Sequence, residues 1–467
     1  MNLTASTLRK IGRILIKYVY KDPKKNIPKL LKVAKRAVGS QFPTDWEALE
    51  DVVHNENNIW HDYLFNALEN IDRELATKMI LTFAIDVGLY GTKTIRANRD
   101  KLKCNIPWII LFDPTSACNL KCKGCWASEY GHTSNLTLDE MRKIVTEANQ
   151  LGTKFFMLTG GEPLVRKKDI LTLCREHRDC LFLIYTNGTL IDDKFCEDIK
   201  EAGNIALALS IEGTEETTDL RRGEGVYNQV KEAMALLRKH KCIFGASVCY
   251  TSANCEAVVS DQFYDMLINE GAMYALYFHY MPIGSDSDTD LLLSPEQREL
   301  VYRRIRGNRN KNTGKPIFVM DFQNDGEFVG GCIAGGRNYF HINSEGDAEP
   351  CVFIHYSDSN IREKSILECL RSPLFYQYYK GQPFNDNMLR PCPMLENPEK
   401  LRQIINTTGA KSTNLNHKET ADQLCSKCDA YAAAWAPKAK AIWEEQARFK
   451  PYTQYYRDTE EAKAENK

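Results

Sequence analysis

Apolar runs of strand length alternate with segments of helical periodicity between residues 104 and 282. A polar or glycine-rich turn follows each run, and six such units fit this part of the chain. Strands that alternate with helices form a parallel sheet with right-handed crossovers, and six units are too few for a closed eightfold barrel. The pattern therefore predicts an α/β fold, a partial (β/α)6 TIM-like barrel, with strands at residues 108–113, 155–158, 181–185, 205–210, 244–250 and 274–280.

The segment between the first two expected strands carries clear helix signals. Thr137 and Glu140 form a capping-box pattern, and the apolar residues that follow recur on one helical face. Gly152 is placed where such a helix ends. This local agreement supports the alternation of strands and helices.

The hundred residues before the barrel look helical and begin with two basic amphipathic segments, separated by Pro23. Residues 1–40 hold eleven Lys and Arg but a single acid, Asp22, in a chain whose net charge is -1. Such helices can lie in the headgroup region of an anionic membrane, or they can pack their apolar stripes on the protein. Nucleic acid is a weaker partner, because stacking aromatic residues are limited to Tyr18 and Tyr20.

Sixteen cysteines are present, with no signal-peptide pattern and no run of about 18 apolar residues. In a reducing cytosol, clustered cysteines are metal ligands or catalytic groups more often than disulfides. We therefore expect a cytoplasmic protein. The basic helices indicate that it could also bind the surface of a membrane.

The alternation stops beyond residue 310, where cysteines, glycines and short segments take over. The expected organisation is a helical basic extension at residues 1–103, the barrel core at 104–310 and a small cysteine-rich domain at 311–467. The last of these ends in a charged tail at residues 459–467.

Cys118, Cys122 and Cys125 lie within eight residues, directly after the first expected strand. Ligand-binding loops belong at that carboxyl edge of a parallel sheet. Three thiolates can bind three irons of a 4Fe-4S cluster and leave the fourth iron open. A structural zinc site, completed by another Cys or by His132, is the alternative, although zinc sites of that kind usually show two separated pairs of ligands.

With the motifs that follow successive strands, this cysteine spacing resembles the radical S-adenosylmethionine (SAM) superfamily over residues 105–285. The resemblance implies that the Gly-Gly-Glu-Pro segment binds the SAM amino group, that the segment from Ser210 contacts its ribose and methionine portion, and that an Arg meets its carboxylate. The implied cofactor-binding residues are Gly160, Gly161, Glu162, Pro163, Asn187, Ser210, Glu212 and Arg222.

One position departs from the family pattern. The residue before the third cysteine is commonly aromatic and packs on adenine, but here it is Gly124, so Trp126 is the candidate replacement. The resemblance further implies reductive cleavage of SAM to a 5'-deoxyadenosyl radical, hydrogen abstraction from a substrate, and a low-potential electron donor of the flavodoxin or ferredoxin type.

A second cysteine set resembles the auxiliary-cluster domain called SPASM. Cys332 and Cys351 flank Gly346 with the spacing of that domain, and three more cysteines follow. The resemblance implies one auxiliary 4Fe-4S cluster, bound by four of five candidate cysteines. Zinc bound by the same ligands is the alternative, because Cys425 and Cys428 form a typical zinc pair. The candidates are Cys332, Cys351, Cys392, Cys425 and Cys428.

The sequence names the cofactor better than the substrate. The basic helices favour a membrane lipid, whose unactivated carbon-hydrogen bonds require a radical. A peptide or protein substrate is the alternative. A third hypothesis is that the protein is not an enzyme but an iron-sulfur sensor or electron-transfer protein. His279, Tyr280 and Asp347 are the candidate residues for substrate contact or catalysis.

Overall fold

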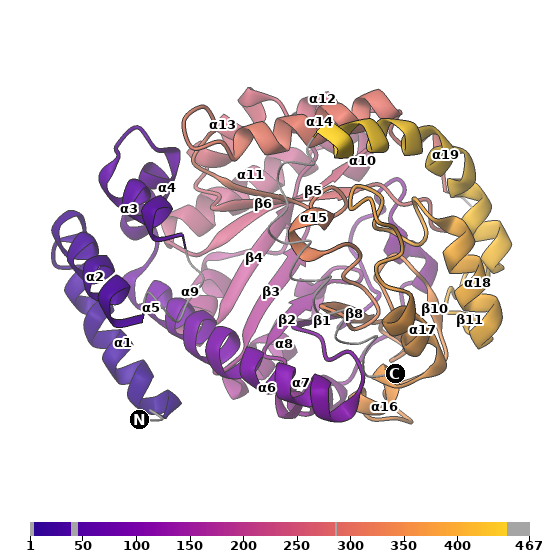
Figure 1. Ribbon diagram of the computed structural model, residues 1–467, viewed down its shortest axis with the longest axis horizontal. Coiled ribbons are helices and arrows are strands. Elements are labelled where there is room, and N and C mark those ends of the chain that lie inside the picture. Colours follow the sequence, from indigo (N-terminus) through magenta and orange to yellow (C-terminus); the bar gives the residue numbers. More distant parts are fainter. Residues whose placement is uncertain (1–3, 39–44, 285–286, 446–467) are drawn as a thin grey trace.

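The computed structural model describes residues 4–38, 45–284 and 287–445. The predicted tail at residues 459–467 lies outside this range. Eight strands form one parallel sheet, and a ninth joins it antiparallel, in the order β7-β6-β5-β4-β3-β2-β1-β8-β9 (Figure 1). The strands are β1 Ile109–Phe112, β2 Phe155–Leu158, β3 Leu181–Thr186, β4 Ile205–Ser210, β5 Phe244–Tyr250, β6 Tyr274–His279, β7 Phe318–Asp321, β8 Tyr339–Ile342 and β9 Ala348–Glu349.

The first six strands confirm the predicted units, with ends that move by at most one residue. The helices around them are α7 Leu138–Leu151, α8 Lys167–Glu176, α9 Asp193–Ala202, α10 Glu215–Arg222, α11 Val226–Lys239, α12 Cys255–Val258, α13 Asp261–Asn269 and α14 Pro295–Asn308. The predicted capping box is present at α7, where Thr137 and Glu140 satisfy each other's backbone amides. Gly152 ends that helix in the left-handed conformation, with φ of 104°.

The prediction that the alternation ends at residue 310 was wrong for two segments. β7 and β8 lie beyond that residue and extend the sheet at both sides. β7 has only four residues, with exposed and buried positions alternating, and β8 contains the polar His341. Neither segment is the continuous apolar run that marks a buried parallel strand. The domain limits at residues 103 and 310 stay predictions.

The helical extension before the barrel is confirmed. Its elements are α1 Ala5–Val19, α2 Pro23–Val38, α3 Trp46–His54, α4 Ile59–Asn70, α5 Arg73–Leu81, the π-helix η1 Thr82–Gly91 and α6 Thr92–Leu102. They cover the amino ends of the strands. The backbone amide of Asp72 donates to the carbonyl of Lys241 before β5, and Lys78 Nζ donates to the carbonyl of Glu201 before β4.

The C-terminal elements cover the opposite, carboxyl ends of the strands and lie on the right of Figure 1. They are α15 Gly326–Val329, α16 Ile366–Leu370, α17 Pro373–Gly381, α18 Pro398–Thr408 and α19 Ala421–Glu445, with the small antiparallel sheet of β10 Tyr356–Ser357 and β11 Lys411–Ser412. Three short helices, η2 Trp126–Tyr130, η3 Pro163–Arg166 and η4 Thr289–Leu291, lie in loops. Among the described helices, none is long and apolar enough to cross a bilayer.

Candidate active site at the carboxyl ends of the strands

A cavity of about 650 Å³ lies inside the barrel, between the loops that follow β1 to β4 and the C-terminal elements. Most of the predicted site residues line it. These are Cys118, Cys122, Cys125, Trp126, Gly160, Gly161, Glu162, Asn187, Ser210, Arg222, His279, Tyr280, Cys332, Cys351 and Cys392. Pro163, Glu212, Asp347, Cys425 and Cys428 do not line it.

The loop that carries the first three cysteines is held by its neighbours. Cys118 Sγ accepts the backbone amide of Leu120 at 3.4 Å, and the amide of Lys123 donates to the carbonyl of Arg221 at 2.7 Å. Burial raises the pKa of Cys118 to about 11 and also raises that of Cys122, against the opposing charge of Arg222. Iron binding at these thiols must therefore displace protons.

Neither cysteine set forms a preformed site for a single ion. Among the described residues, no three His, Cys, Asp or Glu side chains converge closely enough to hold one metal ion. His132, the proposed fourth zinc ligand, has its Nδ1 3.4 Å from the carbonyl oxygen of Ser116. The three thiols nevertheless face one cavity, and a 4Fe-4S cluster is bound by cysteines on separate irons, which are spread more widely than ligands of one ion. The arrangement fits the cluster.

The two glycines after β2 allow a close backbone approach. A Cβ at Gly161 would collide with the carbonyl oxygens of Ser116 and Ala117, and Gly160 has φ of 103°. The next residue, Glu162, is buried and accepts hydrogen bonds from Thr186 Oγ1 and from the amide of Asn187, both at 2.7 Å. Burial raises its pKa, although these bonds oppose the shift. Glu162 therefore ties the loops after β2 and β3 together beneath the cavity.

Two arginines share one buried carboxylate near the cysteine loop. Arg221 and Arg222 both pair with Glu212, which has no exposed surface. Glu212 has a lowered pKa because the two cations outweigh the effect of burial. The group as a whole keeps one positive charge, and Arg222 Nη1 lies 3.8 Å from Cys122 Sγ. Arg221 also lines the cavity, although the sequence motif indicated only Arg222.

Tyr280 explains why the residue before the third cysteine is glycine. A Cβ on Gly124 would lie 2.8 Å from Cε2 of the Tyr280 ring, so the ring occupies the space of a side chain at that position. The Tyr280 hydroxyl is buried beside the backbone of Asp288. Trp126, the replacement suggested by the sequence, lies edge-on to the rings of Tyr130 and His341.

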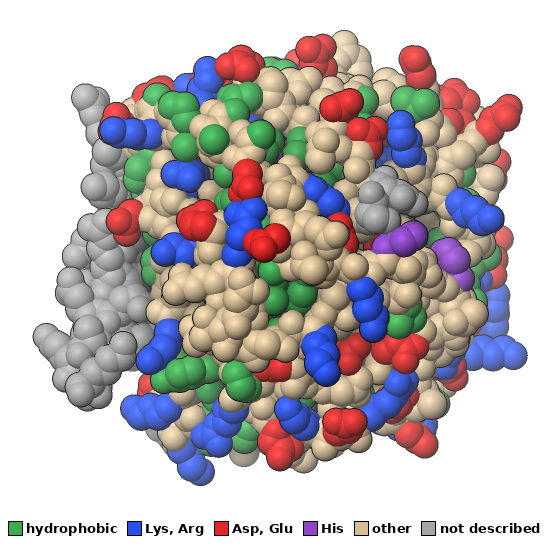
Figure 2. All heavy atoms as spheres, turned by 90° about the vertical axis from the view of Figure 1, so that its right-hand side faces the viewer, with side chains coloured by type: hydrophobic (Ala, Val, Ile, Leu, Met, Phe, Trp, Pro, Cys, Tyr) green, Lys and Arg blue, Asp and Glu red, His purple; other side chains and the backbone are tan. Residues whose placement is uncertain are grey.

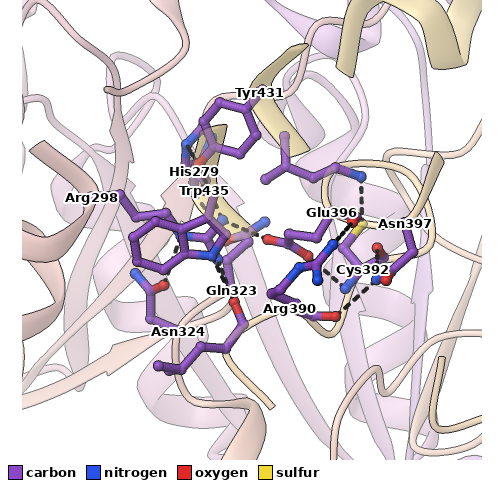
Figure 3. A network of polar contacts seen from close by, with 12 residues as sticks. His279, Arg298, Gln323, Asn324, Arg390, Cys392, Glu396, Asn397, Tyr431 and Trp435 are labelled. Atoms are coloured by element: carbon purple, nitrogen blue, oxygen red, sulfur yellow. Dashed lines mark hydrogen bonds and ion pairs between the residues drawn. The ribbon is translucent and has the colours of Figure 1, made fainter. Parts of the chain in front are cut away.

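A buried polar network joins the end of β6 to the C-terminal elements (Figure 3). His279 Nδ1 donates to the carbonyl of Tyr280 at 2.6 Å, so its Nε2 accepts the hydroxyl proton of Tyr431 at 2.8 Å. Arg298 donates to the same hydroxyl at 3.1 Å and pairs with Glu396 at 2.6 Å. Burial and the Arg298 cation lower the pKa of His279 to about 3, so this imidazole stays neutral.

The network ends at the second cysteine set. Glu396 accepts the backbone amide of Cys392 at 2.7 Å, and Arg298 stacks on Trp435 with its guanidinium 4.4 Å from the ring centroid. Asp347, the third candidate for substrate contact, instead bonds Asn360 at 2.9 Å in the turn before β9. His279 and Tyr280 line the cavity, whereas Asp347 lies away from it.

The second set of cysteines is brought together from distant segments. Cys332, Cys351 and Cys392 line the same cavity, and Cys425 and Cys428 lie on α19. Cys392 Sγ accepts the amides of Met394 at 3.4 Å and Leu395 at 3.3 Å. Cys332 and Cys351 accept backbone hydrogen bonds from Ala334 and Phe353 in the same way, and burial raises the pKa of both thiols.

Known proteins resemble this chain in its sequence and in its fold. Residues 112–251 match the Radical SAM superfamily model. AdoMet-dependent heme synthase of Methanosarcina barkeri is 27% identical over 292 residues, which are 56% of this chain and 82% of the relative. Serine-type anaerobic sulfatase-maturating enzyme of Klebsiella aerogenes is 29% identical over 199 residues, 38% of this chain and 48% of that enzyme.

Among solved structures, Streptococcus suis SuiB bound to S-adenosylmethionine superposes with a TM-score of 0.54 at 17% identity, over 72% of this chain and 81% of SuiB. At that identity the likeness concerns the fold, and it confirms the expected α/β barrel core. Three cysteines in the loop after β1, the ordered motifs around the cavity and the matching family model lead to one conclusion: residues 112–251 form a Radical SAM domain, and the chain is a radical SAM enzyme with a cysteine-rich C-terminal region.

Proposed function

We propose that this enzyme works at an anionic membrane surface and abstracts hydrogen from the aliphatic chain of a lipid. The observation that carries the proposal is the outward face of α1. Ile11, Ile14, Leu15 and Tyr18 recur at helical spacing, and 42%, 67%, 43% and 36% of their surfaces are exposed. An amphipathic helix on a globular protein normally buries this stripe.

Arginines help to hold the other face of α1 on the protein, together with partly buried apolar residues such as Leu8 and Ile16. Arg9 pairs with Asp86 in η1, and Arg13 pairs with Glu74 in α5 at 2.8 Å. Gly12 packs beside Leu81 at the same contact. Because the charges hold α1 to the protein, its apolar stripe stays free for another apolar phase. The bilayer boundary is such a phase.

Helices α1 and α2 and the turn between them also carry lysines without ion pairs among the described residues. The structure shows no ion pair between the following lysines and any other described residue: Lys10, Lys17, Lys21, Lys25, Lys29 and Lys32. Each Lys near an anionic surface contributes about 1 kcal/mol to membrane binding. Figure 2 shows a different face, on the right-hand side of Figure 1, where acidic and basic side chains are intermixed. Charge complementarity therefore favours the N-terminal helices as the membrane-facing end.

The residues of the cavity would divide the chemistry as follows. Cys118, Cys122 and Cys125 would hold the 4Fe-4S cluster, and Arg221 and Arg222 would supply the positive charge for a carboxylate. When bound and reduced, cluster and SAM supply a 5'-deoxyadenosyl radical. The apolar walls and the C-terminal elements exclude water from the site. The electron would come from a flavodoxin or ferredoxin type of donor.

We assign an auxiliary centre to the second cysteine set. The sulfur atoms of Cys332, Cys351 and Cys392 each accept a hydrogen bond from a backbone amide, and all three residues line the cavity. Either Cys425 or Cys428 on α19 would complete the four ligands. Thiolates stabilised by such amides are typical of iron-sulfur ligands. A 4Fe-4S cluster is the proposed occupant, with zinc as the alternative that metal analysis distinguishes.

Vesicle flotation tests the membrane proposal. Full-length protein should float with phosphatidylglycerol vesicles and not with phosphatidylcholine vesicles, and added salt should weaken the binding. Ile14→Glu should abolish flotation by placing a charge in the stripe. Leu415→Glu, at an exposed apolar position far from α1 in the chain, is the matched control. Equal flotation of wild type and Ile14→Glu would contradict the proposal.

A tetrapyrrole substrate is the second candidate. Three relatives are named AdoMet-dependent heme synthase, and the alignment covers up to 92% of the relative's length. A peptide substrate has weaker support, from a SuiB structure bound to its precursor peptide at 18% identity. Titration with iron coproporphyrin, followed by its absorption spectrum, separates these candidates, since saturable binding at micromolar ligand would favour the tetrapyrrole over the lipid.

A further inference from the structure

The cavity continues below the cysteine loops into the barrel. Its lower arm is formed by six side chains on the strands: Ile109, Leu111, Met157, Phe278, Phe318 and Met320. Ile109 and Phe318 are the first residues of β1 and β7, at the amino ends of these strands. Since a strand rises about 3.3 Å per residue, the arm reaches roughly 10 Å below the level of Asp321.

This lower arm has almost nothing polar to recognise. Beside it, the hydroxyl of Tyr185 donates to the sulfur of Met157 at 3.7 Å. Arg309 and Asp325 also line the cavity and pair with each other at 2.7 Å, which leaves Arg309 Nε as a buried donor without a partner among the described residues. A sugar, nucleotide or peptide backbone bound in the lower arm would lose hydrogen bonds to water and find few partners. The arm therefore fits a hydrocarbon.

The arm is uncovered along β7, the edge strand of the sheet. Phe318 is 43% exposed and Met320 is 37% exposed, although both line the cavity, and Phe328 of α15 is 43% exposed beside them. Phe322, directly after β7, lies edge-on to Tyr339, the first residue of β8, at 5.7 Å and to Phe353 at 6.3 Å between centroids. These rings close part of the gap between β7 and β8, and Phe318 and Met320 on the β7 side of the gap stay partly exposed.

We propose that an aliphatic chain enters between β7 and β8 and lies in the lower arm, with Phe318 setting how much of its length is accepted. The choice of a lipid chain as occupant rests on the proposed function and on the cationic, apolar N-terminal surface. Helix α5, beside that surface, contacts the segments just before β4 and β5, on the same side of the parallel sheet as the amino ends of β1 and β7 that the arm approaches. A chain drawn from the membrane would reach the cysteine loops through this arm.

Calorimetric binding of octanoate, dodecanoate and hexadecanoate to the full-length protein tests the inference. Affinity should rise by up to about fourfold per added methylene and then level off when the arm is full. Phe318→Trp should weaken hexadecanoate binding by about tenfold or more and leave octanoate unchanged. Phe318→Ala should move the plateau to longer chains. Leu415→Trp, at an exposed position outside the cavity, should keep the wild-type profile.

Two further readouts separate the possible failures. SAM affinity, measured on the same samples, should be unchanged in Phe318→Trp, which shows that the variant is folded around its cofactor site. If Phe318→Trp and wild type show the same dependence of affinity on chain length, the chains bind elsewhere and the inference is wrong. The absence of binding to the wild type would also overturn it. If the Phe318 variants change the binding of the chains but the protein does not float with vesicles, the lower arm is supported as the binding site. The proposal that the N-terminal helices bind a membrane would then be wrong.

Discussion

Cys118, Cys122 and Cys125 come from one loop of eight residues, whereas the second cysteine set is drawn from segments that lie up to about a hundred residues apart in the chain. The first loop needs only the carboxyl ends of β1 and β2 and the start of η2 to take its shape. The second set depends on the packing of the turns before β8 and after β9, the loop after α17, and helix α19. A local site and an assembled site therefore face each other across one cavity.

This difference determines what holds each site in place. Around the first set, backbone hydrogen bonds and two glycines suffice. Around the second, Arg298 and Glu396 are fully buried and connect α14, α19 and the Cys392 loop (Figure 3). Damage to this network should consequently disturb the second site and leave the first intact.

Replacement of Arg298 should have the largest effect on folding stability. Arg298→Met leaves Glu396 buried without its partner and removes the donor to Tyr431, and we expect a loss of about 3–5 kcal/mol in the free energy of unfolding. Chemical denaturation of the purified protein measures it. Arg303→Met, in the same helix as Arg298, removes exposed ion pairs with Glu299 and Glu445 and should cost less than about 1 kcal/mol. Similar losses in both variants would show that the buried network is not what holds the C-terminal elements.

A smaller effect is expected from His341, which links the two sites. Its Nε2 faces Asp113 at 2.9 Å after β1, and its Nδ1 faces Glu349 at 2.7 Å in β9. These carboxylates raise the pKa of His341 to about 10 despite burial. Because the folded pKa lies above the unfolded value, the stabilisation is complete below about pH 6.5 and is lost as the pH rises towards 10.

The pH dependence of unfolding gives the corresponding measurement. Between pH 7 and 10 the wild type should lose on the order of a few kcal/mol, and His341→Gln should be less stable at neutral pH but show a flatter profile. His240→Gln, at an imidazole that pairs with the exposed Asp193, is the control and should keep the wild-type slope. An unchanged slope in His341→Gln would mean that other groups govern stability in this range.

The parts of this molecule that could be predicted from sequence are those whose cause is local. Six strands were visible as apolar runs, and the cysteine loop was visible as close spacing. β7 was missed because Phe318 and Met320 leave it half exposed, so that it lacks the pattern of a buried strand. No sequence signal linked Gly124 to Tyr280 or His279 to Tyr431, since these contacts join residues about 150 positions apart.

The orientation of α1 could not be predicted either. Its apolar stripe and its arginines were both evident, but the side that packs on the protein is decided by Asp86 and Glu74, which lie more than sixty residues away. Arg9 and Arg13 turn towards the protein, whereas Ile11, Ile14, Leu15 and Tyr18 are exposed. The membrane proposal rests on this orientation.

Metal analysis of anaerobically purified protein tests the central claim most directly, with 5'-deoxyadenosine assayed after reduction. Wild type should hold about eight irons per chain, and a triple Ala variant of Cys118, Cys122 and Cys125 should keep about four and lose SAM cleavage entirely. A triple Ala variant of Cys332, Cys351 and Cys392 should lose the other four. Zinc without iron in the wild type, or SAM cleavage that survives loss of the first three cysteines, would contradict the account.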